Sequence, residues 1–162
     1  PGRFEHVDAG QNFQVIVDYA HTDDGLRNVL NAARGICDGR LIVVFGCGGD
    51  RDKTKRPKMG AVAAQLGDFA IVTSDNPRSE DPERILLDIE VGLQHAGKQK
   101  YDDYETILDR TEAIRRAIGM AKAGDAIMIA GKGHEDYQIV GTETRAFSDR
   151  ETVQAYLSGG AA

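Results

Sequence analysis

The sequence predicts an α/β fold in which helices cover a mainly parallel sheet, and two observations support this prediction. Four apolar runs are continuous rather than alternating, a pattern typical of strands that are buried on both faces. Segments with helical spacing of apolar residues lie between these runs, and strands that alternate with helices favour parallel pairing. The 162 residues are enough for one domain with a substantial core.

The strands are expected in a simple order along the chain. The continuous apolar runs predict four strands, over residues 13–17, 41–45, 69–72 and 126–130. A weaker fifth strand is expected over residues 104–108. Segments 137–140 and 144–148 lie on either side of Gly141 and indicate an antiparallel hairpin or edge strand near the C-terminus.

Three helices are expected between the first strands. The first carries apolar residues at the spacing i, i+3, i+4 and i+7, namely Leu26, Val29, Leu30 and Ala33. The second is expected over residues 57–66, with Pro57 at its first position, where a missing N–H costs little. The third follows Asp81-Pro82 and carries the apolar stripe Ile85, Leu86, Ile89 and Leu93.

A fourth helix is predicted from a capping signal at its start and a glycine at its end. It begins after Asp109, which forms a pair resembling a capping box with Glu112, and it is expected to stop at Gly124. Its apolar stripe consists of Ile114, Ala117, Ile118 and Ala121.

A fifth helix closes the predicted domain. Ser148 and Glu151 predict its cap, and it is expected to run through Leu157. We expect residues 1–158 to form the domain and residues 159–162 to form a flexible tail. No internal repeat or low-complexity linker divides the chain.

Composition excludes several classes of function. The formal charge is 20 − 26 = −6, which argues against a general binder of nucleic acid or acidic membranes, because phosphate neutralisation requires a basic surface. No apolar run approaches the roughly 20 residues of a membrane helix. Neither the two cysteines nor the four histidines have metal-ligand spacing, so no metal site is expected. Without a signal peptide in "PGRFEHVDAG", we expect a cytoplasmic location.

Polar clusters follow the carboxyl ends of the four main strands. In chain order they are "DYAHTDD", "GCGGDRDKTKRP", "TSDNPR" and "GKGHEDY". Ligands of parallel sheets gather outside the carboxyl ends of the strands. We therefore expect the four loops to converge on one edge of the sheet and to form a site there.

The loops offer charges of both signs. The cations are Arg51, Lys53 and Arg78, and the anions are Asp50, Asp75 and Glu135. In "GKGHE", Gly131 and Gly133 permit close backbone approach, and Lys132 and His134 supply donors. Such a rim suits a small zwitterionic or phosphate-bearing ligand.

Two nucleotide-binding motifs are incomplete. A P-loop requires glycine directly before its lysine, but Asp52 precedes Lys53-Thr54. A dinucleotide fingerprint requires a short turn into a helix, and six charged or polar residues follow "GCGGD" before Pro57. We therefore expect no nucleoside-triphosphate cradle in this chain.

Four segments together resemble the motifs of the Mur ligase family: "VDYAHT", "FGCGGDRDKTKRPKMG", "TSDNPRSEDP" and "AGKGHEDYQIVG". The likeness extends from about Pro1 to Leu157 and is greatest to the diaminopimelate-adding members. It implies the C-terminal one of three domains, a Rossmann-like three-layer α/β/α unit. It also implies that two domains lie outside this chain, a central one with the ATP P-loop and magnesium ligands and an N-terminal one for the uridine nucleotide.

The resemblance further implies a reaction of peptidoglycan synthesis. ATP, with Mg²⁺, would phosphorylate a carboxylate of the UDP-muramoyl dipeptide, and the amine of meso-diaminopimelate would attack the acyl phosphate to form an amide. The catalytic core would lie in the central domain, so no catalytic residue is expected here. The rest of the same protein would be the partner over which this domain closes.

Site residues also follow from the resemblance. The diaminopimelate-binding residues would be Arg51, Asp75, Asn76, Pro77, Arg78, Gly131 and Glu135. The residues on the ATP side or at the domain seam would be Asp18, His21, Asp50 and Lys53. In this interpretation Arg78 selects the second carboxylate of diaminopimelate. One departure is Asp23, which replaces the usual proline of the family and is expected to cap the next helix.

Other interpretations stay open from the sequence. The chain also fits a lysine-adding Mur ligase, a ligase domain similar to that of cyanophycin synthetase, or a non-catalytic ligand-binding module. Taken alone, "TSDNPRSEDP" fits an ordinary turn before a capped helix. The motif "DNPR" favours the diaminopimelate interpretation over the first two.

Overall fold

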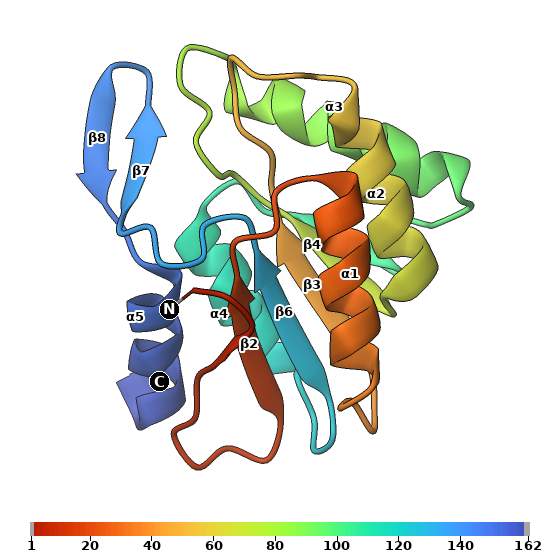
Figure 1. The fold of residues 1–162 in the computed structure, drawn as a ribbon, viewed down its shortest axis with the longest axis vertical. Helices are drawn as coiled ribbons and strands as arrows, with labels where there is room; N and C mark the ends of the chain where they lie inside the picture. Colours follow the sequence, from red (N-terminus) through yellow and green to blue (C-terminus); the bar gives the residue numbers. More distant parts are fainter. Residues whose placement is uncertain (1, 161–162) are drawn as a thin grey trace.

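The computed structural model describes residues 2–160, which are arranged as helices on both sides of a central sheet (Figure 1). The sheet has six strands in the order β1-β2-β6-β3-β4-β5. These strands are β1 (Glu5–His6), β2 (Gln14–Asp18), β3 (Leu41–Phe45), β4 (Phe69–Val72), β5 (Tyr104–Thr106) and β6 (Ala126–Ala130). All pairs are parallel except the β1–β2 pair at the edge, so the predicted α/β class and mainly parallel sheet are confirmed.

The parallel strands end level with one another. Asp18 and Phe45 are both in register with Ala130, Phe45 is in register with Val72, and Val72 is in register with Thr106. The loops that follow these strands therefore start from a common edge. This alignment places the polar loops side by side.

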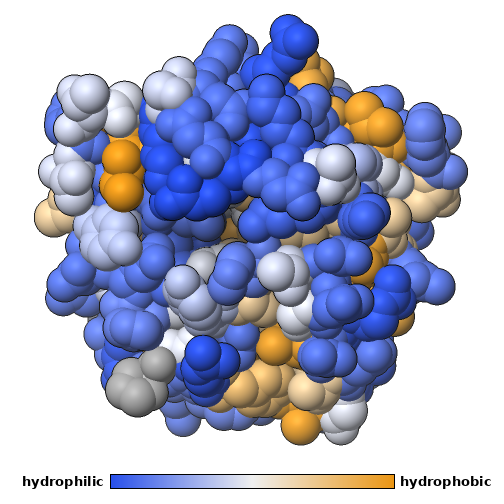
Figure 2. Space-filling model, turned by 45° about the horizontal axis from the view of Figure 1, so that its top comes forward, coloured by the Kyte–Doolittle hydropathy of each residue, from blue (hydrophilic) through white to orange (hydrophobic). Residues whose placement is uncertain are grey.

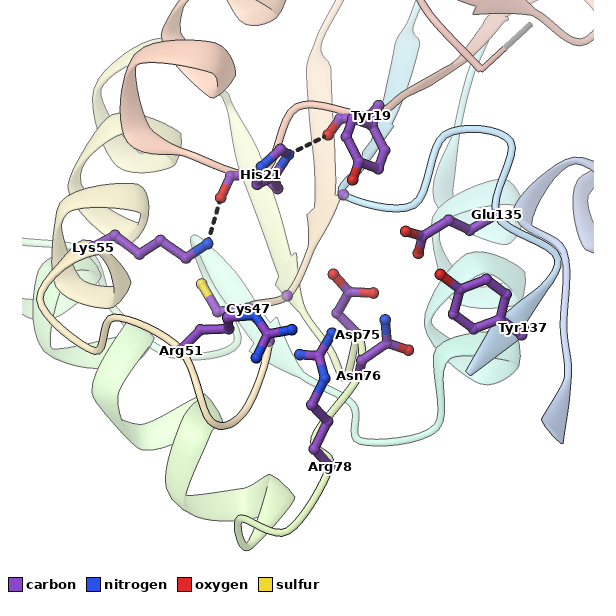
Figure 3. Close-up of a pocket in the computed structure, with 13 residues that line it drawn as sticks. Tyr19, His21, Cys47, Arg51, Lys55, Asp75, Asn76, Arg78, Glu135 and Tyr137 are labelled. Atoms are coloured by element: carbon purple, nitrogen blue, oxygen red, sulfur yellow. Dashed lines mark hydrogen bonds between the residues drawn. The ribbon is translucent and has the colours of Figure 1, made fainter. Parts of the chain in front are cut away.

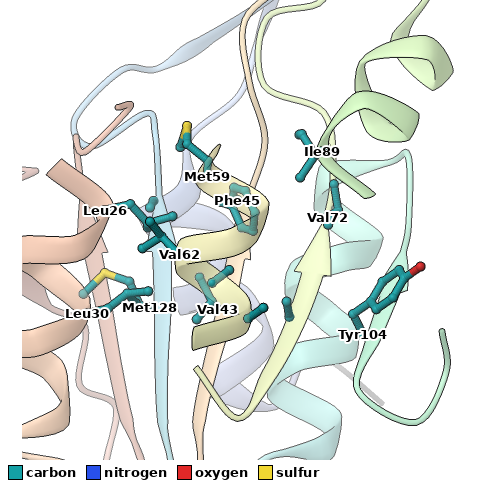
Figure 4. Close-up of a cluster of buried hydrophobic side chains, with 14 of the residues drawn as sticks. Leu26, Leu30, Val43, Phe45, Met59, Val62, Val72, Ile89, Tyr104 and Met128 are labelled. Carbon is teal, nitrogen blue, oxygen red and sulfur yellow. The ribbon is translucent and has the colours of Figure 1, made fainter. Parts of the chain in front are cut away.

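Helices cover both faces of the sheet. On one face lie α1 (Asp23–Arg34), α2 (Lys55–Leu66) and α3 (Pro82–His95), and on the other lie α4 (Arg110–Met120) and α5 (Asp149–Ala155). Because successive strand residues point to opposite faces, β3 contributes to both cores. Val43 packs under α1 and α2 (Figure 4), whereas Val44 packs against α4 and α5. These two buried layers hold the sheet edge rigidly beneath the loops.

Side-chain caps fix where the helices begin. Thr22 accepts a hydrogen bond from Gly25 N at 3.0 Å and caps α1, so the expectation that Asp23 would be the cap is wrong. Asp23 is the first helical residue instead, where its carboxylate interacts favourably with the helix dipole. The predicted caps Asp109 of α4 and Ser148 of α5 are confirmed.

Two predicted helix boundaries were wrong. Helix α2 starts at Lys55, so Pro57 is its third residue, still within the first turn, where no backbone N–H is required. Helix α4 ends at Met120, because Ala121 is already extended. Gly124 lies in the turn before β6 with φ of 87° and does not cap the helix.

The C-terminal part begins with the predicted hairpin, formed by β7 (Tyr137–Val140) and β8 (Glu143–Ala146). It is a separate two-stranded sheet that projects beyond the main one (Figure 1). Helix α5 ends at Ala155, two residues before its predicted end at Leu157, and a last kinked turn spans Tyr156–Gly160. The end of the predicted tail, residues 161–162, lies outside the described residues.

Residues 2–160 lack both a membrane-spanning helix and a metal-binding cluster. No helix in this range is long and apolar enough to cross a membrane. The same range holds no cluster of three or more His, Cys, Asp or Glu side chains that would suit a metal ion.

Candidate functional site

Four loops meet around one cavity at the carboxyl edge of the sheet (Figure 3). The cavity has a volume of about 350 Å³, and residues after β2, β3, β4 and β6 line it. Figure 2, which brings this end of the molecule forward, shows a mainly hydrophilic surface. The predicted convergence of the four loops is thus confirmed.

Asp75 provides a buried negative charge in the cavity. Its side chain follows β4, and one of its oxygens lies 2.9 Å from Lys132 Nζ. Burial alone would raise the pKa of the Asp75 carboxyl, but the nearby charges of Arg110 and Lys132 outweigh burial and lower the pKa below its usual value. Asp75 is therefore ionised at neutral pH and suits binding of an ammonium group.

Asn76 is held in one orientation beside Asp75. Its Oδ1 accepts hydrogen bonds from Lys132 Nζ and from the backbone N of Ile139, each at 2.9 Å. With the oxygen occupied in this way, the amide nitrogen Nδ2 is the end available to a ligand. The Asn76 side chain is therefore a hydrogen-bond donor towards the cavity.

Arg78 sits at a strained point of the chain. Its φ is 51°, and its Nη1 donates to the carbonyl of Gly49 at 2.9 Å. Its backbone is bonded on both sides to the hairpin, with Arg78 N donating to Ile139 O at 3.1 Å and Gly141 N donating to Arg78 O at 2.6 Å. These bonds hold the conformation that directs the guanidinium into the cavity (Figure 3).

The loop after β3 packs backbone to backbone against the loop that carries Arg78. Gly49 N donates to the carbonyl of Asn76 at 2.7 Å, and a Cβ on Gly49 would collide with the carbonyl of Pro77. A Cβ on Gly46 would likewise collide with the carbonyl of Thr73. Glycine is needed at both positions so that the two loops approach this closely.

A buried arginine joins these loops through ion pairs. Arg56 is fully buried and bonds Glu80, Asp88 and the carbonyl of Gly48. Hydrogen bonds from Arg56 and from the backbone N of Asp50 lower the pKa of Glu80 to about 2. This network fixes the base of the loop from which Arg51 projects.

Arg110 performs a similar role beneath the cavity. It is fully buried and forms two parallel hydrogen bonds with Asp149, at 2.8 and 2.9 Å. Its remaining donors bond the carbonyls of Ser74 and Ala130, at the ends of β4 and β6. Arg110 therefore ties together the two strand ends that carry Asp75 and Gly131.

The opposite rim contains His21, Tyr19 and Lys55. Lys55 Nζ donates to the carbonyl of His21 at 2.7 Å, and the ring of His21 packs edge-on against Tyr19 at 4.7 Å between centroids. His21 Nδ1 lies 3.0 Å from the carbonyl of Tyr19. Its other ring nitrogen is the one left to face a ligand.

The charges in the cavity fall into two groups. Figure 3 shows the guanidinium groups of Arg51 and Arg78 close together on one side, and the carboxylates of Asp75 and Glu135 on the other. Two guanidiniums are suited to carboxylates, and two carboxylates to ammonium groups. The cavity thus has the chemistry of an amino-acid site.

The family profile described as "Mur ligase, glutamate ligase domain" matches residues 2–133. The chain belongs to the Mur ligase family. It spans about a third of the length of the curated relatives it matches.

Three known proteins illustrate what this Mur ligase chain is similar to. The UDP-N-acetylmuramoyl-L-alanyl-D-glutamate--2,6-diaminopimelate ligase of Syntrophomonas wolfei is 55% identical over 159 residues, which cover 98% of this chain and 32% of that protein. A solved structure with the same enzyme name superposes with a TM-score of 0.90 at 40% identity, covering 100% of this chain and 32% of the other. A bifunctional folylpolyglutamate synthase/dihydrofolate synthase, solved with Mn, AMPPNP and L-glutamate bound, shares the fold, with a TM-score of 0.60 at 21% identity, covering 81% of this chain and 28% of the other.

The Mur ligase chain brings most of the predicted amino-acid site together. The predicted residues that line the cavity are Arg51, Asp75, Asn76, Arg78, Gly131 and Glu135. Pro77 does not line it; this residue faces a second hollow on the other side of the loop. His21, predicted on the ATP side, lines the cavity as well.

Three residues predicted on the ATP side lie outside the cavity. Asp18 is only 7% exposed, and its carboxylate accepts hydrogen bonds from Phe4 N and Ala20 N, each at 2.7 Å. Asp50 bonds the backbone and hydroxyl of Ser79, and Lys53 lies 3.6 Å from Glu80. The contacts of these three side chains are thus with other residues of this Mur ligase chain.

Sequence reasoning missed several residues of the cavity and its base. Tyr19, Cys47 and Tyr137 line the cavity. The Cys47 thiol is not poised as a nucleophile, because burial raises its pKa to about 12. Lys132 was expected to be a donor to a ligand but is buried against protein acceptors.

Proposed function

We propose that this chain is the amino-acid-binding domain of a ligase that adds meso-diaminopimelate to UDP-N-acetylmuramoyl-L-alanyl-D-glutamate. The ligase would use ATP to convert the carboxylate of the dipeptide to an acyl phosphate, which the amine then attacks to form an amide. Residues 1–158 would form the domain, and the catalytic core would lie in the remaining two thirds of the protein. The enzyme names of the similar proteins support this proposal.

One observation carries the choice of amino acid. The cavity presents two guanidiniums, from Arg51 and Arg78, and two carboxylates, from Asp75 and Glu135. Diaminopimelate has two carboxylates and two ammonium groups, so each charge of the ligand finds a partner. Lysine lacks the second carboxylate and would leave one guanidinium without an anion.

Each charged group would have a distinct task. Arg78, with one nitrogen bonded to Gly49, has the remaining donors for the carboxylate at the far end of the ligand, beside the Asn76 amide. Asp75 would bind an ammonium and would not take its proton, since the pKa of its carboxyl is lowered. Arg51 and Glu135 would hold the opposite charges of the ligand.

ATP and Mg²⁺ would be bound mainly outside this chain. The sequence lacks a P-loop, and residues 2–160 contain no cluster suited to a metal ion. His21 and Lys55 form the rim nearest the end of β2 and would face the phosphates when the domains close. Asp18, Asp50 and Lys53 would contribute at the seam, as the family resemblance implies.

Titration of the purified chain with three amino acids tests the proposal. Calorimetry and backbone NMR should show binding of meso-diaminopimelate, at least about tenfold weaker binding of L-lysine, and none of L-arginine. An Arg84→Ala variant, altered at an exposed site on α3, should bind as the unmodified chain does. Stronger binding of lysine would instead favour the lysine-adding reaction, and binding of arginine would favour a ligase similar to cyanophycin synthetase.

A further inference from the structure

Lys132 lies under the cavity and reaches three acceptors with one ammonium group. Its Nζ is 2.9 Å from each of Asp75 Oδ1, Asn76 Oδ1 and the carbonyl of Tyr137. The ammonium donates hydrogen bonds to Asn76 Oδ1 and to the Tyr137 carbonyl, and its contact with Asp75 Oδ1 is an ion pair without hydrogen-bond geometry. The side chain is fully buried and is not among the residues that line the cavity, so it would not touch a bound amino acid.

The three acceptors come from two segments of the fold, and Lys132 itself comes from a third. Asp75 and Asn76 follow β4, Tyr137 begins the hairpin, and Lys132 follows β6. Glu135 adds a fourth neighbour, with its carboxylate 3.8 Å from Nζ. A buried ammonium is costly unless its protons are bonded, so this arrangement holds all four partners in place.

Lys132 is the cation in direct contact with Asp75. Arg110 also acts on Asp75 through its charge, but its own donors are bonded to Asp149, Ser74 and Ala130. The two cations therefore have different tasks. Arg110 ties strand ends together, whereas Lys132 orients the side chains that face the cavity.

Asn76 shows how this orientation affects recognition. Lys132 and the backbone N of Ile139 both donate to Oδ1, which leaves Nδ2 for the ligand. An amide nitrogen donates to a carboxylate and does not accept from an ammonium. The orientation of Asn76 thus adds to the preference for a carboxylate at the position of Arg78.

We propose that Lys132 is a positioning residue for amino-acid recognition, which holds Asp75 as an acceptor for the ligand's ammonium and Asn76 as a donor for its carboxylate. This role rests on the proposed function of the cavity. It assigns to Lys132 a contribution to selectivity without contact with the ligand.

NMR of the free chain tests the orientation without any ligand. In the unmodified chain, the protons of the Lys132 ammonium should exchange slowly with water and be detected by their ¹⁵N signal. In Lys132→Met, the Asn76 side-chain amide signals should shift and the Asp75 carboxyl should titrate at higher pH. A rapidly exchanging Lys132 ammonium would overturn the proposal even if the variant failed to fold. Unchanged Asn76 and Asp75 signals in a folded variant would overturn it as well.

Kinetics of the full-length ligase that carries this chain test the consequence for recognition. Lys132→Met should raise the KM for diaminopimelate about tenfold or more and leave the KM for ATP unchanged. Lys132→Arg should not restore it, because a planar guanidinium cannot reproduce the contacts that one ammonium nitrogen makes with Asp75, Asn76 and Tyr137. Equal increases in both KM values would indicate a general structural role and overturn the proposal.

Two control variants separate positioning from destabilisation. Lys58→Met removes an exposed lysine of α2, and Glu90→Gln disturbs a buried hydrogen bond to Tyr104 outside the cavity. Both should keep the KM for diaminopimelate. If the unmodified chain does not bind diaminopimelate and the full-length ligase does not turn it over, the proposed function fails. The NMR signals of Asn76 and Asp75 would still decide whether Lys132 orients these two side chains.

Discussion

The carboxylate of Asp50 binds both the backbone N–H and the side-chain hydroxyl of Ser79. The carboxylate of Asp50 accepts from Ser79 N at 3.2 Å and from Ser79 Oγ at 2.7 Å, and Asp50 N donates to Glu80 Oε2 at 2.6 Å. The two loops therefore exchange hydrogen bonds in both directions. Since one loop carries Arg51 and the other Arg78, this exchange sets the separation of the two guanidiniums.

The pH dependence of stability should reveal this connection. The pKa of Glu80 is lowered from 4.5 to about 2, so its contribution to folding is fully present above pH 4.5 and is lost as the pH falls towards 2. Glu80→Gln should therefore be less stable than the unmodified chain at pH 7, and the difference should shrink on acidification. Urea unfolding at several pH values between 7 and 3 measures this. A difference that stays constant with pH would contradict the prediction.

Arg78→Ala should change the choice of amino acid. In the full-length ligase, kcat/KM for diaminopimelate should fall about 30-fold or more, since removing one partner of a desolvated charged pair costs about 2–5 kcal/mol. Use of lysine should stay constant or rise, and Arg78→Lys should recover little, because an ammonium cannot form two parallel bonds. Steady-state kinetics with both amino acids measure this. Equal decreases in kcat/KM for both amino acids would show that Arg78 is a general electrostatic contact and does not select between them.

The isolated chain should fold but should not turn over ATP. Both hydrophobic cores lie within it, whereas a P-loop is missing from its sequence. A cooperative urea transition and the absence of phosphate release with ATP, Mg²⁺ and both substrates are expected. Phosphate release above background from the purified chain would refute this.

Arg110→Met should destabilise the fold strongly. It leaves Asp149 as a buried charge without its partner, which costs about 3–5 kcal/mol in comparable pairs. The double variant Arg110→Met/Asp149→Leu should recover part of this loss, because no buried charge remains. Urea unfolding of the three proteins gives the comparison. A double variant less stable than Arg110→Met would contradict the explanation.

The sequence predicted the sheet and the loops well because their signals are local. Continuous apolar runs identify buried strands, and polar clusters directly after them identify the site edge. β1 was missed, because two residues, Glu5 and His6, are too few for a pattern and pair only through their backbone with β2. Pro57 misplaced the start of α2, because proline is tolerated anywhere in the first turn.

The base of the site depends on long-range contacts that no local pattern reveals. Arg110 meets Asp149, 39 residues further along the chain, and Lys132 meets Asn76, 56 residues before it. In the sequence each looks like an ordinary charged residue at a helix start or in a loop. Their burial arises only when the strand ends come together.

The loop that carries Arg78 keeps its shape through its main chain. Both hydrogen bonds to the hairpin use the backbone N and O of Arg78, so they do not depend on the guanidinium and should persist with any unbranched side chain other than proline. The side chain, to which we attribute the choice of amino acid, is therefore independent of the contacts that shape the loop, and an unbranched residue can replace arginine without moving the backbone. The main restriction is conformational, since a β-branched residue would resist a φ of 51°. In a binding pocket organised in this way, a single substitution can change which ligand is bound while the surrounding fold stays the same.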